Sequence, residues 1–265
     1  MNKHIVLTGG HSGMGLELTK ILKGQGHKIG LIVRSEKRKE DAIAALGNSS
    51  EIDFFFADLG KREAIQQVVQ DIQVKWEKID VLFNNAGVLL DKLYLSDYGN
   101  ELQLEINAIS PFLLTKGLFP LLERSENPIV VNTATSGLQK RKSINIPNLK
   151  RPKKFTKLTG SYMDSKFTMV LLMNYLSVQN DNIRIISVDP GAIKTKMTAG
   201  KGMPFWLKPI RNLLFKSPEE GAGNLYDAAF GMDIIESGVY VSGGSSKKMA
   251  LVIKESEVDG ILAIA

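Results

Sequence analysis

Cysteine is absent from the sequence, which excludes disulfides, thiolate nucleophiles and cysteine-based zinc sites. Only three histidines are present, His4, His11 and His27, all near the amino terminus. We therefore expect neither a histidine-rich metal centre nor a serine-protease-type triad, and we predict no metal site. No hydrophobic run approaches the about 20 residues of a membrane span. The apolar stretch 5–7 is too short for the core of a secretion signal, so we expect a cytoplasmic protein.

The composition is otherwise that of a globular protein, with 43% hydrophobic and 23% charged residues. This much apolar material can bury a sizeable core, and it excludes collagen-like, coiled-coil and wholly disordered chains. The 265 residues show no internal repeat and no long linker. We therefore predict one domain that spans residues 1–265.

The net charge of +6 comes from one segment, residues 139–157, which holds eight basic residues and no acidic one. The rest of the chain has 26 basic and 28 acidic residues, so the basicity does not indicate a general nucleic-acid surface. Two prolines, Pro147 and Pro152, predict that this insertion is a loop. Its basic residues are Lys140, Arg141, Lys142, Lys150, Arg151, Lys153, Lys154 and Lys157.

Short apolar runs alternate with longer helical patterns along the chain. The clearest helix covers 64–76, where Ile65, Val68, Val69, Ile72 and Trp76 share one face. Strands that are apolar on both faces and alternate with helices predict an α/β protein with a doubly wound parallel sheet of about seven strands. The expected strands are 3–7, 28–33, 52–57, 81–84, 129–133, 184–189 and 239–241.

A glycine-rich turn follows the first expected strand and leads directly into a helical pattern. Its glycines Gly9, Gly13 and Gly15 leave room for a close approach of the backbone to a pyrophosphate, and the helix start supplies N–H groups. Ser12 and Met14 lie between these glycines. A tight turn without a ligand is the alternative, but the strand–turn–helix context favours dinucleotide binding.

The end of the second strand bears on which dinucleotide binds. A carboxylate there would bind the ribose hydroxyl of NAD, whereas arginine accepts the phosphate of NADP. The strand leads into Arg34 and Ser35, so we favour NADP(H) over NAD(H). Glu36 is close enough to keep NAD(H) open, and Arg34 could also be only a solvated charge at a helix start.

Further motifs follow in a fixed order, and together they resemble the short-chain dehydrogenase/reductase family over nearly the whole chain. The resemblance implies a Rossmann-like fold and an NAD(P)-dependent oxidoreductase acting on CH–OH or C=O groups. It also implies adenine contact by Asp58 and Leu59 and a helix asparagine, Asn107, that anchors a water for proton transfer. The other matching motifs are Asn85-Ala86-Gly87 beside the cofactor, the catalytic pair Tyr162 and Lys166, and Pro190, Gly191, Ile193 and Thr195 around the nicotinamide.

Tyr162 and Lys166 are four residues apart and so share one face of a helix. A free tyrosine has a pKa of about 10. We expect the lysine ammonium and an oxidised nicotinamide to lower the pKa of Tyr162, because both favour the phenolate. Tyr162 could then protonate a developing alkoxide or deprotonate an alcohol. The resemblance also implies that Lys166 holds the nicotinamide ribose.

The sequence departs from the family after the fifth strand, where a Ser-Ser pair usually supplies the hydroxyl that polarises the substrate carbonyl. Here the run is Thr135-Ser136-Gly137. Counting from Asn132 favours Thr135, and counting back from Gly137 favours Ser136. Either hydroxyl could donate the required hydrogen bond, so we favour Thr135 and keep Ser136 as the alternative.

The basic insertion lengthens the gap between Thr135 and Tyr162 to 27 residues. The position of this insertion, like the run 97–102, resembles retinol-dehydrogenase-like and protochlorophyllide-reductase-like members of the family, and the chain as a whole resembles retinol-dehydrogenase-like and carbonyl-reductase-like members. Three roles of this basic insertion remain open: it binds an anionic substrate, it is a solvated loop, or it contacts a membrane surface. Membrane contact is not favoured. The family places a substrate lid at about 192–216. Here its large apolar residues favour either a lipophilic substrate or ordinary packing: Phe205, Trp206, Leu207 and Ile210.

The leading hypothesis is thus an NADP(H)-dependent reductase or dehydrogenase of a small, lipophilic carbonyl or alcohol. The alternative is a non-catalytic nucleotide-sensing protein on the same fold, which would not need the proton donor Tyr162. The resemblance implies a homodimer or homotetramer. We expect no nucleic-acid partner, because basic and aromatic residues do not interleave along the rest of the chain.

Overall fold

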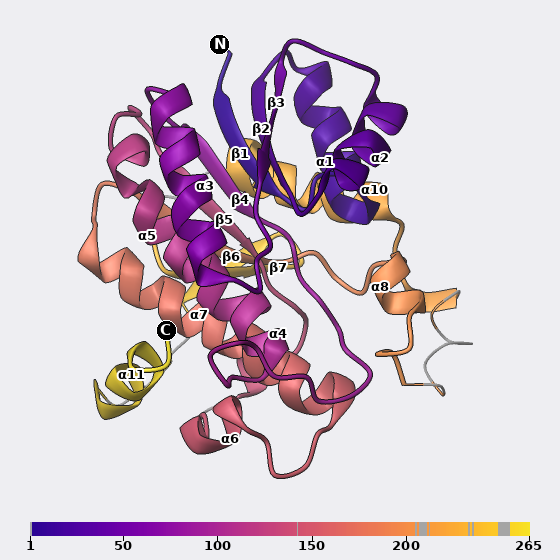
Figure 1. The fold of residues 1–265 in the computed structure, drawn as a ribbon, viewed down its shortest axis with the longest axis vertical. Helices are drawn as coiled ribbons and strands as arrows, with labels where there is room; N and C mark the ends of the chain where they lie inside the picture. Colours follow the sequence, from indigo (N-terminus) through magenta and orange to yellow (C-terminus); the bar gives the residue numbers. More distant parts are fainter. Residues whose placement is uncertain are drawn as a thin grey trace.

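The computed structural model describes residues 2–141, 143–204, 206, 211, 213–232, 234, 236–248 and 255–265. At its centre lies one eight-stranded sheet in the order β3-β2-β1-β4-β5-β6-β7-β8 (Figure 1). Strands β1 to β7 are parallel, and β8 is antiparallel to β7. The strands are β1 His4–Thr8, β2 Lys28–Val33, β3 Ile52–Phe56, β4 Val81–Asn84, β5 Ile129–Thr133, β6 Arg184–Asp189, β7 Val239–Ser242 and β8 Ser245–Lys248.

Successive apolar residues of each inner strand enter two separate hydrophobic clusters. In β1, Ile5 and Leu7 pack into one cluster and Val6 into the other, and all three side chains are fully buried. A sheet covered on both faces needs this continuous apolar pattern, which is why the strands could be recognised in the sequence. The strand order reverses direction between β1 and β4, and ligands bind at such a switch point in doubly wound sheets.

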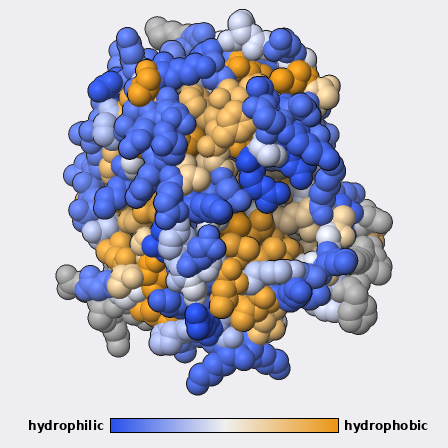
Figure 2. Space-filling model, viewed as in Figure 1, coloured by the Kyte–Doolittle hydropathy of each residue, from blue (hydrophilic) through white to orange (hydrophobic). Residues whose placement is uncertain are grey.

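Helices cover both faces of the sheet. Residues of α1 (Gly13–Gly24), α2 (Glu36–Leu46) and α10 (Pro218–Tyr226) belong to the cluster on one face. The cluster on the other face contains residues of α3 (Arg62–Lys75), α5 (Ser110–Leu122) and α7 (Met163–Gln179). Figure 2 shows one side of the molecule, largely hydrophilic at its edges, with apolar residues exposed in its upper centre and in its lower half. The shorter elements are α4 Leu102–Leu104, η1 Glu105–Ile109, η2 Leu138–Lys140, α6 Ile146–Lys150, η3 Lys157–Tyr162, α8 Lys196–Ala199, η4 Asp227–Gly231 and α11 Glu255–Leu262.

The predicted doubly wound sheet is confirmed, with eight strands instead of about seven. All seven predicted strands are present within one residue at either end, and the predicted helix 64–76 is α3, which begins two residues earlier. The additional strand β8 is short and polar, so it lacks the apolar run used to find the others. It follows a Gly243-Gly244 turn in which both residues have positive φ, as tight hairpins require.

The basic segment 139–157 is not wholly a loop, so that prediction is wrong in part. Helix α6 lies within it, and the Asn145 side chain accepts the backbone N–H of Asn148 as its cap. Pro147 sits in the first turn, where its missing N–H has no helical partner to lose, and Leu149 is buried. The prolines therefore permit this helix.

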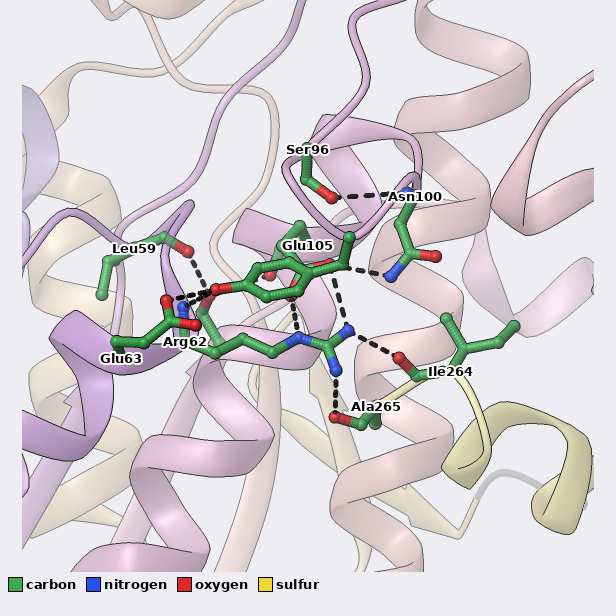
Figure 3. Close-up of polar contacts among 10 residues, drawn as sticks. Leu59, Arg62, Glu63, Ser96, Asn100, Glu105, Ile264 and Ala265 are labelled. Atoms are coloured by element: carbon green, nitrogen blue, oxygen red, sulfur yellow. Dashed lines mark hydrogen bonds and ion pairs between the residues drawn. The ribbon is translucent and has the colours of Figure 1, made fainter.

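A buried ion pair fixes η1 against the start of α3 (Figure 3). The Arg62 guanidinium donates to both carboxylate oxygens of Glu105 at 2.7 and 3.3 Å, and it also donates to the backbone carbonyls of Ile264 and Ala265. Asn100 donates a further hydrogen bond of 2.9 Å to Glu105, which is fully buried. These contacts tie α3, η1 and the segment after α11 together. None of the helices that the structure describes combines the length and apolarity needed to span a bilayer.

Candidate active site

Two cavities open side by side at the carboxyl ends of the parallel strands. The first, of about 360 Å³, is lined by the glycine-rich loop after β1 and by residues after β4, and is called the glycine-loop cavity below. The second, of about 370 Å³, is lined mainly by apolar residues that follow β5 and β6 and is called the apolar cavity. Both therefore lie at the strand ends where the fold places ligands.

The glycine-rich loop packs so tightly that side chains could not replace its glycines. Gly9 has φ +72°, and a Cβ on Gly15 would come within 2.3 Å of the Gly9 carbonyl oxygen. Ser12 precedes α1 in an extended conformation, and its side chain does not cap the first-turn N–H groups. These N–H groups and the open backbone fit a pyrophosphate. All five predicted loop residues line this cavity: Gly9, Ser12, Gly13, Met14 and Gly15.

Thr8 holds the segment after β4 against the glycine-rich loop. Its hydroxyl oxygen accepts the backbone N–H groups of Asn85 and Ala86 at 3.0 Å each, and its carbonyl accepts the Asn85 amide at 3.0 Å. A Cβ on Gly9 would lie 3.1 Å from the Ala86 Cα, so the two segments nearly touch. The predicted cofactor residues Asn85, Ala86 and Gly87 consequently line the same cavity.

One end of the glycine-loop cavity is rich in cationic side chains. Arg34, predicted to select the cofactor, lines it together with Arg38 and Lys196, and His11 lies among them. Burial is the main cause that lowers the pKa of His11, followed by the neighbouring arginine charge of Arg38, and its Nδ1 is buried without a hydrogen-bond partner. Three cations and one neutral imidazole fit a phosphate group.

Two residues near this cationic end do not line the cavity. Ser35 is the extended residue before α2, and the Glu36 carboxylate forms an ion pair with Lys39 at 3.1 Å. Sequence reasoning therefore named Arg34 but missed His11, Arg38 and Lys196. For Arg38 the signal was present, since it lies one helical turn after Arg34.

Asp58 and Leu59, the predicted adenine contacts, also lie outside both cavity linings. The Asp58 carboxylate accepts the Gly60 N–H at 2.9 Å, and the Leu59 carbonyl accepts the Ser110 hydroxyl. These bonds shape the turn between β3 and α3. The predicted contact with adenine stays a prediction.

Asn107 occupies a π-helical turn, η1, and is fully buried outside the cavity linings. Its side chain bonds both backbone groups of Val88 and donates to the Ser165 hydroxyl at 3.0 Å. Pro111 follows four residues later and has no N–H to donate to the Asn107 carbonyl. The turn is thus irregular where the family places its water anchor, and π-turns are frequent at functional sites. Bonding by Asn107 to a water stays a prediction.

Tyr162 lies on the boundary between the two cavities and lines both. It is the last residue of η3 and precedes α7, on which Lys166 follows one turn later. The Lys166 ammonium donates to the Thr133 carbonyl at 2.7 Å and lies beside Gly87, whose added Cβ would be 3.4 Å away. The residues that line both cavities are Met14, Thr133, Tyr162, Thr195 and Met197.

The expected lowering of the Tyr162 pKa by Lys166 is wrong for the protein alone. Burial raises the pKa of Tyr162 to about 12, which a hydrogen bond from Thr135 offsets only in part, and Asp189 raises it further. Burial also lowers the pKa of Lys166 to about 8. Desolvation disfavours both charged forms, and it is the largest cause of each shift.

The two candidate hydroxyls after β5 have different partners. The Thr135 side chain lies beside Tyr162, where it lowers the pKa of that phenol, and its backbone carbonyl accepts the Tyr240 hydroxyl at 2.8 Å. The Ser136 hydroxyl instead donates to the Asp189 carboxylate at 2.9 Å. Both residues line the apolar cavity, and which of the two hydroxyls polarises the substrate carbonyl stays a prediction.

The turn after β6 forms one wall of the apolar cavity. Pro190, Gly191 and Ile193 line it, and Gly191 adopts φ +90°, which glycine allows at no steric cost. Thr195 caps α8 through a reciprocal bond with Thr198 and lines both cavities. These predicted nicotinamide contacts are thus placed beside Tyr162, while the contacts themselves stay predictions.

The predicted lid contributes to the apolar cavity through residues other than those singled out. Trp206 is 57% exposed and does not line it, and Phe205, Leu207 and Ile210 lie outside the described residues. The large apolar lining residues from this segment are instead Met197, Met203 and Phe215. Leu89, Leu158 and Met163 complete the apolar lining, and Leu89 lies directly beside Gly202.

Arg141 is the one charged residue among the described residues that line the apolar cavity. Its guanidinium forms an ion pair with Asp164 and donates to the Thr159 carbonyl at 3.0 Å. These two partners lie on either side of the Gly160 kink in η3. The basic insertion therefore holds the turn that carries Tyr162. Within the described part of the chain, no group of three His, Asp or Glu residues is placed to hold a metal.

The family model for short chain dehydrogenases matches residues 3–148, more than half of the chain. The chain belongs to the short-chain dehydrogenase family. As a member, it is an NAD(P)-dependent oxidoreductase that acts on alcohol or carbonyl groups. The predicted family is thereby confirmed.

Relatives with established names are similar over most of this short-chain dehydrogenase. Polyprenol dehydrogenase from Danio rerio is 28% identical over 247 residues, covering 86% of this chain and 74% of the relative. Retinol dehydrogenase 11 from Mus musculus is 27% identical over 225 residues, covering 83% and 71%. The predicted resemblance to retinol-dehydrogenase-like members is borne out.

Solved structures share the fold. Salutaridine reductase from Papaver somniferum superimposes with a TM-score of 0.73 at 22% identity, covering 91% of this chain and all of that one. NADPH-bound carbonyl reductase from chicken fatty liver gives a TM-score of 0.71 at 18% identity, covering 91% and 96%. At these identities the likeness shows the fold alone.

Proposed function

We propose that this short-chain dehydrogenase transfers hydride between NADP(H) and a lipophilic carbonyl or alcohol, with Tyr162 as the proton donor and acceptor. One observation carries the proposal: Tyr162 lies where the glycine-loop cavity meets the apolar cavity. A dinucleotide in the first cavity and a substrate in the second would both reach its hydroxyl. When bound, the nicotinamide supplies or accepts the hydride.

The residues around the glycine-loop cavity fit NADP(H). The N–H groups at the start of α1 and the open glycine backbone would hold the pyrophosphate. Arg34, Arg38 and Lys196 would hold the ribose phosphate, which NAD(H) lacks. Glu36 is the carboxylate that could have favoured NAD(H) binding. It forms an ion pair with Lys39 and does not line the glycine-loop cavity.

Tyr162 is suited to give a proton. With a pKa of about 12 its hydroxyl stays protonated at neutral pH, so it can donate to a substrate oxygen as negative charge develops there. The Thr135 hydroxyl, in the lining of the same cavity as Tyr162, would donate to the same oxygen. The Lys166 ammonium would stabilise the phenolate that Tyr162 leaves behind.

The substrate proposal rests on the second cavity. Leucine, methionine and phenylalanine side chains dominate its lining, and its one charged residue, Arg141, is paired with Asp164. A neutral apolar group loses little hydration when it enters such a cavity. A carboxylate would lose its hydration there, and the one cation it could pair with is already paired with Asp164. The similar proteins named above are dehydrogenases of retinol and polyprenol, which are apolar alcohols.

Turnover of a panel of lipophilic ketones, aldehydes and alcohols with NADPH or NADP⁺ tests this function. We expect reduction of at least one member, and Tyr162→Phe should lower its kcat by about 10²–10⁴-fold while NADPH still binds. The matched control is Tyr175→Phe, on α7 but outside both cavities. Equal turnover by the parent and Tyr162→Phe would refute the acid–base role.

A further inference from the structure

Two segments of the chain are strongly basic and contain no acidic residue. Segment 139–157 has eight lysines and arginines, and segment 190–218 has six. Together they carry 14 of the 34 basic residues and none of the 28 acidic ones, so the remaining chain has 20 basic and 28 acidic side chains. The two segments are therefore strongly positive, and the rest of the chain has a net negative charge.

The fold brings both segments to the rim of the apolar cavity. Arg141 and Leu158 line it from one side, and Met197 and Phe215 line it from the other. The two basic segments also touch directly, because the Lys157 ammonium donates to the backbone carbonyl of residue 201 at 2.9 Å.

Exposed apolar side chains gather at the same rim. Trp206, Leu213 and Leu214 are 57%, 84% and 68% exposed and belong to the second basic segment. Three of the nine large apolar side chains that are exposed in the described part of the chain therefore lie in the segment that also supplies Met203 and Phe215 to the cavity lining.

We propose that this rim, called the mouth surface below, docks on an anionic phospholipid bilayer. Its exposed members are Trp206, Leu213, Leu214, Lys201 and Lys216. Tryptophan and leucine favour the boundary between headgroups and acyl chains, and lysines beside them are attracted by anionic headgroups. A cavity that opens at such a surface would receive an apolar substrate without its passage through water. This last step rests on the proposed function, whereas the docking itself does not.

The partner is argued from the combination of charges and apolar groups. A nucleic acid would be held by the basic residues but would leave Leu213 and Leu214 exposed to water. An acidic protein would pair with the lysines, but it would also need apolar residues of its own to cover the leucines. An anionic bilayer can contact both kinds of side chain at once, because its interior is apolar and its surface carries negative charge.

Tryptophan fluorescence gives a direct test, because the sequence has only two tryptophans and Trp76 is 5% exposed. We expect vesicles of phosphatidylcholine with phosphatidylserine to shift the emission to the blue and to sediment the full-length protein. Vesicles of pure phosphatidylcholine should bind about tenfold or more weakly. Trp206→Phe should abolish the shift. Sedimentation without a shift would place the contact elsewhere and overturn the proposal.

Matched charge variants separate this surface from general basicity. Lys201→Gln/Lys216→Gln should weaken binding to the anionic vesicles by about tenfold. The control Lys78→Gln/Lys116→Gln removes the same charge from the strand-start edge and from α5, and should change binding little. Leu213→Ser/Leu214→Ser should also weaken it while leaving the charge unchanged.

Three results would contradict the docking: equal losses in both lysine variants, no binding to anionic vesicles, or tight binding of duplex DNA or an acidic protein in place of vesicles. Vesicle binding is measured without cofactor or substrate. Failure of the carbonyl assay therefore leaves the docking result intact, and failure of docking leaves the hydride-transfer proposal intact.

Discussion

Asn107 bonds both backbone polar groups of Val88: its Oδ1 accepts the Val88 N–H at 2.8 Å, and its Nδ2 donates to the Val88 carbonyl at 2.9 Å. The two bonds fix the chain just after Gly87, in the wall of the glycine-loop cavity. The same amide donates to Ser165, three residues after Tyr162. One buried side chain therefore joins the cavity wall to the helix that carries the proposed acid.

Replacing Asn107 by leucine should leave both Val88 groups unpaired and lower the free energy of unfolding by about 1–3 kcal/mol. NADPH binding should weaken as well, because the wall after Gly87 loses its support. Urea unfolding and calorimetric titration measure the two effects. Ser165→Ala is the control, since it removes one partner only and should cost less. An unchanged NADPH affinity in Asn107→Leu would show that the wall does not need this residue.

We expect substitutions at Thr135 and Ser136 to affect substrate turnover differently. Thr135→Val should lower kcat by about 10²–10³-fold, because it removes the hydroxyl beside Tyr162 that would polarise the substrate carbonyl, while it keeps the side-chain shape. Ser136→Ala should leave kcat nearly unchanged, since that hydroxyl bonds Asp189. Steady-state kinetics with one active carbonyl measures both. If the losses are reversed, Ser136 is the polarising hydroxyl.

The pH dependence of carbonyl reduction should follow Lys166. Burial lowers the pKa of Lys166 to about 8, so its positive charge is present below that pH and is lost as the pH rises through it. The phenolate formed on Tyr162 then loses its neighbouring cation, and kcat should fall on the alkaline side. Lys166→Arg keeps a charge at all these pH values and should remove the fall. A fall that persists unchanged in this variant would assign it to another group.

The Arg62–Glu105 pair should dominate the stability of the region shown in Figure 3. Arg62→Met leaves the buried Glu105 charge with only Asn100 as a side-chain partner, so we expect a loss of about 3–5 kcal/mol in the free energy of unfolding. Lys39→Met breaks the exposed pair with Glu36 and should change stability little. Urea unfolding measures the free energy of unfolding of the two variants. Equal losses in both would contradict the larger contribution expected from the Arg62–Glu105 pair.

Sequence patterns predicted the parts of the fold that depend on local apolar order. Strands such as β1 and β4 are continuous apolar runs because helices cover the sheet on both faces. Strand β8 could not be found in this way, since a polar edge strand depends on its pairing with β7. Helix α6 was not predicted because the two prolines of the basic segment favour a loop, although Pro147 lies in the first turn of the helix and Pro152 lies beyond its end.

The site was predictable where a motif fixes the backbone, and less so where side chains converge from distant segments. The glycine-rich loop and Asn85 line the cavity because their local conformation puts them there. Lys196 and Arg141 reach the cavities from segments that no spacing rule links to β1. The effect of burial on Tyr162 likewise depends on the whole surrounding packing, so the sequence suggested the wrong sign.

Calorimetric titration with NADPH and, separately, NADH tests the account most directly, because it needs no substrate. Arg34, Arg38 and Lys196 should make NADPH bind about tenfold or more tightly than NADH. Arg34→Ser/Arg38→Ser should remove most of that difference while leaving NADH affinity unchanged. Tight NADPH binding with this loss of preference is the result we predict. Binding of neither dinucleotide would contradict the account, and a preference for NADH would overturn the role given to the arginines.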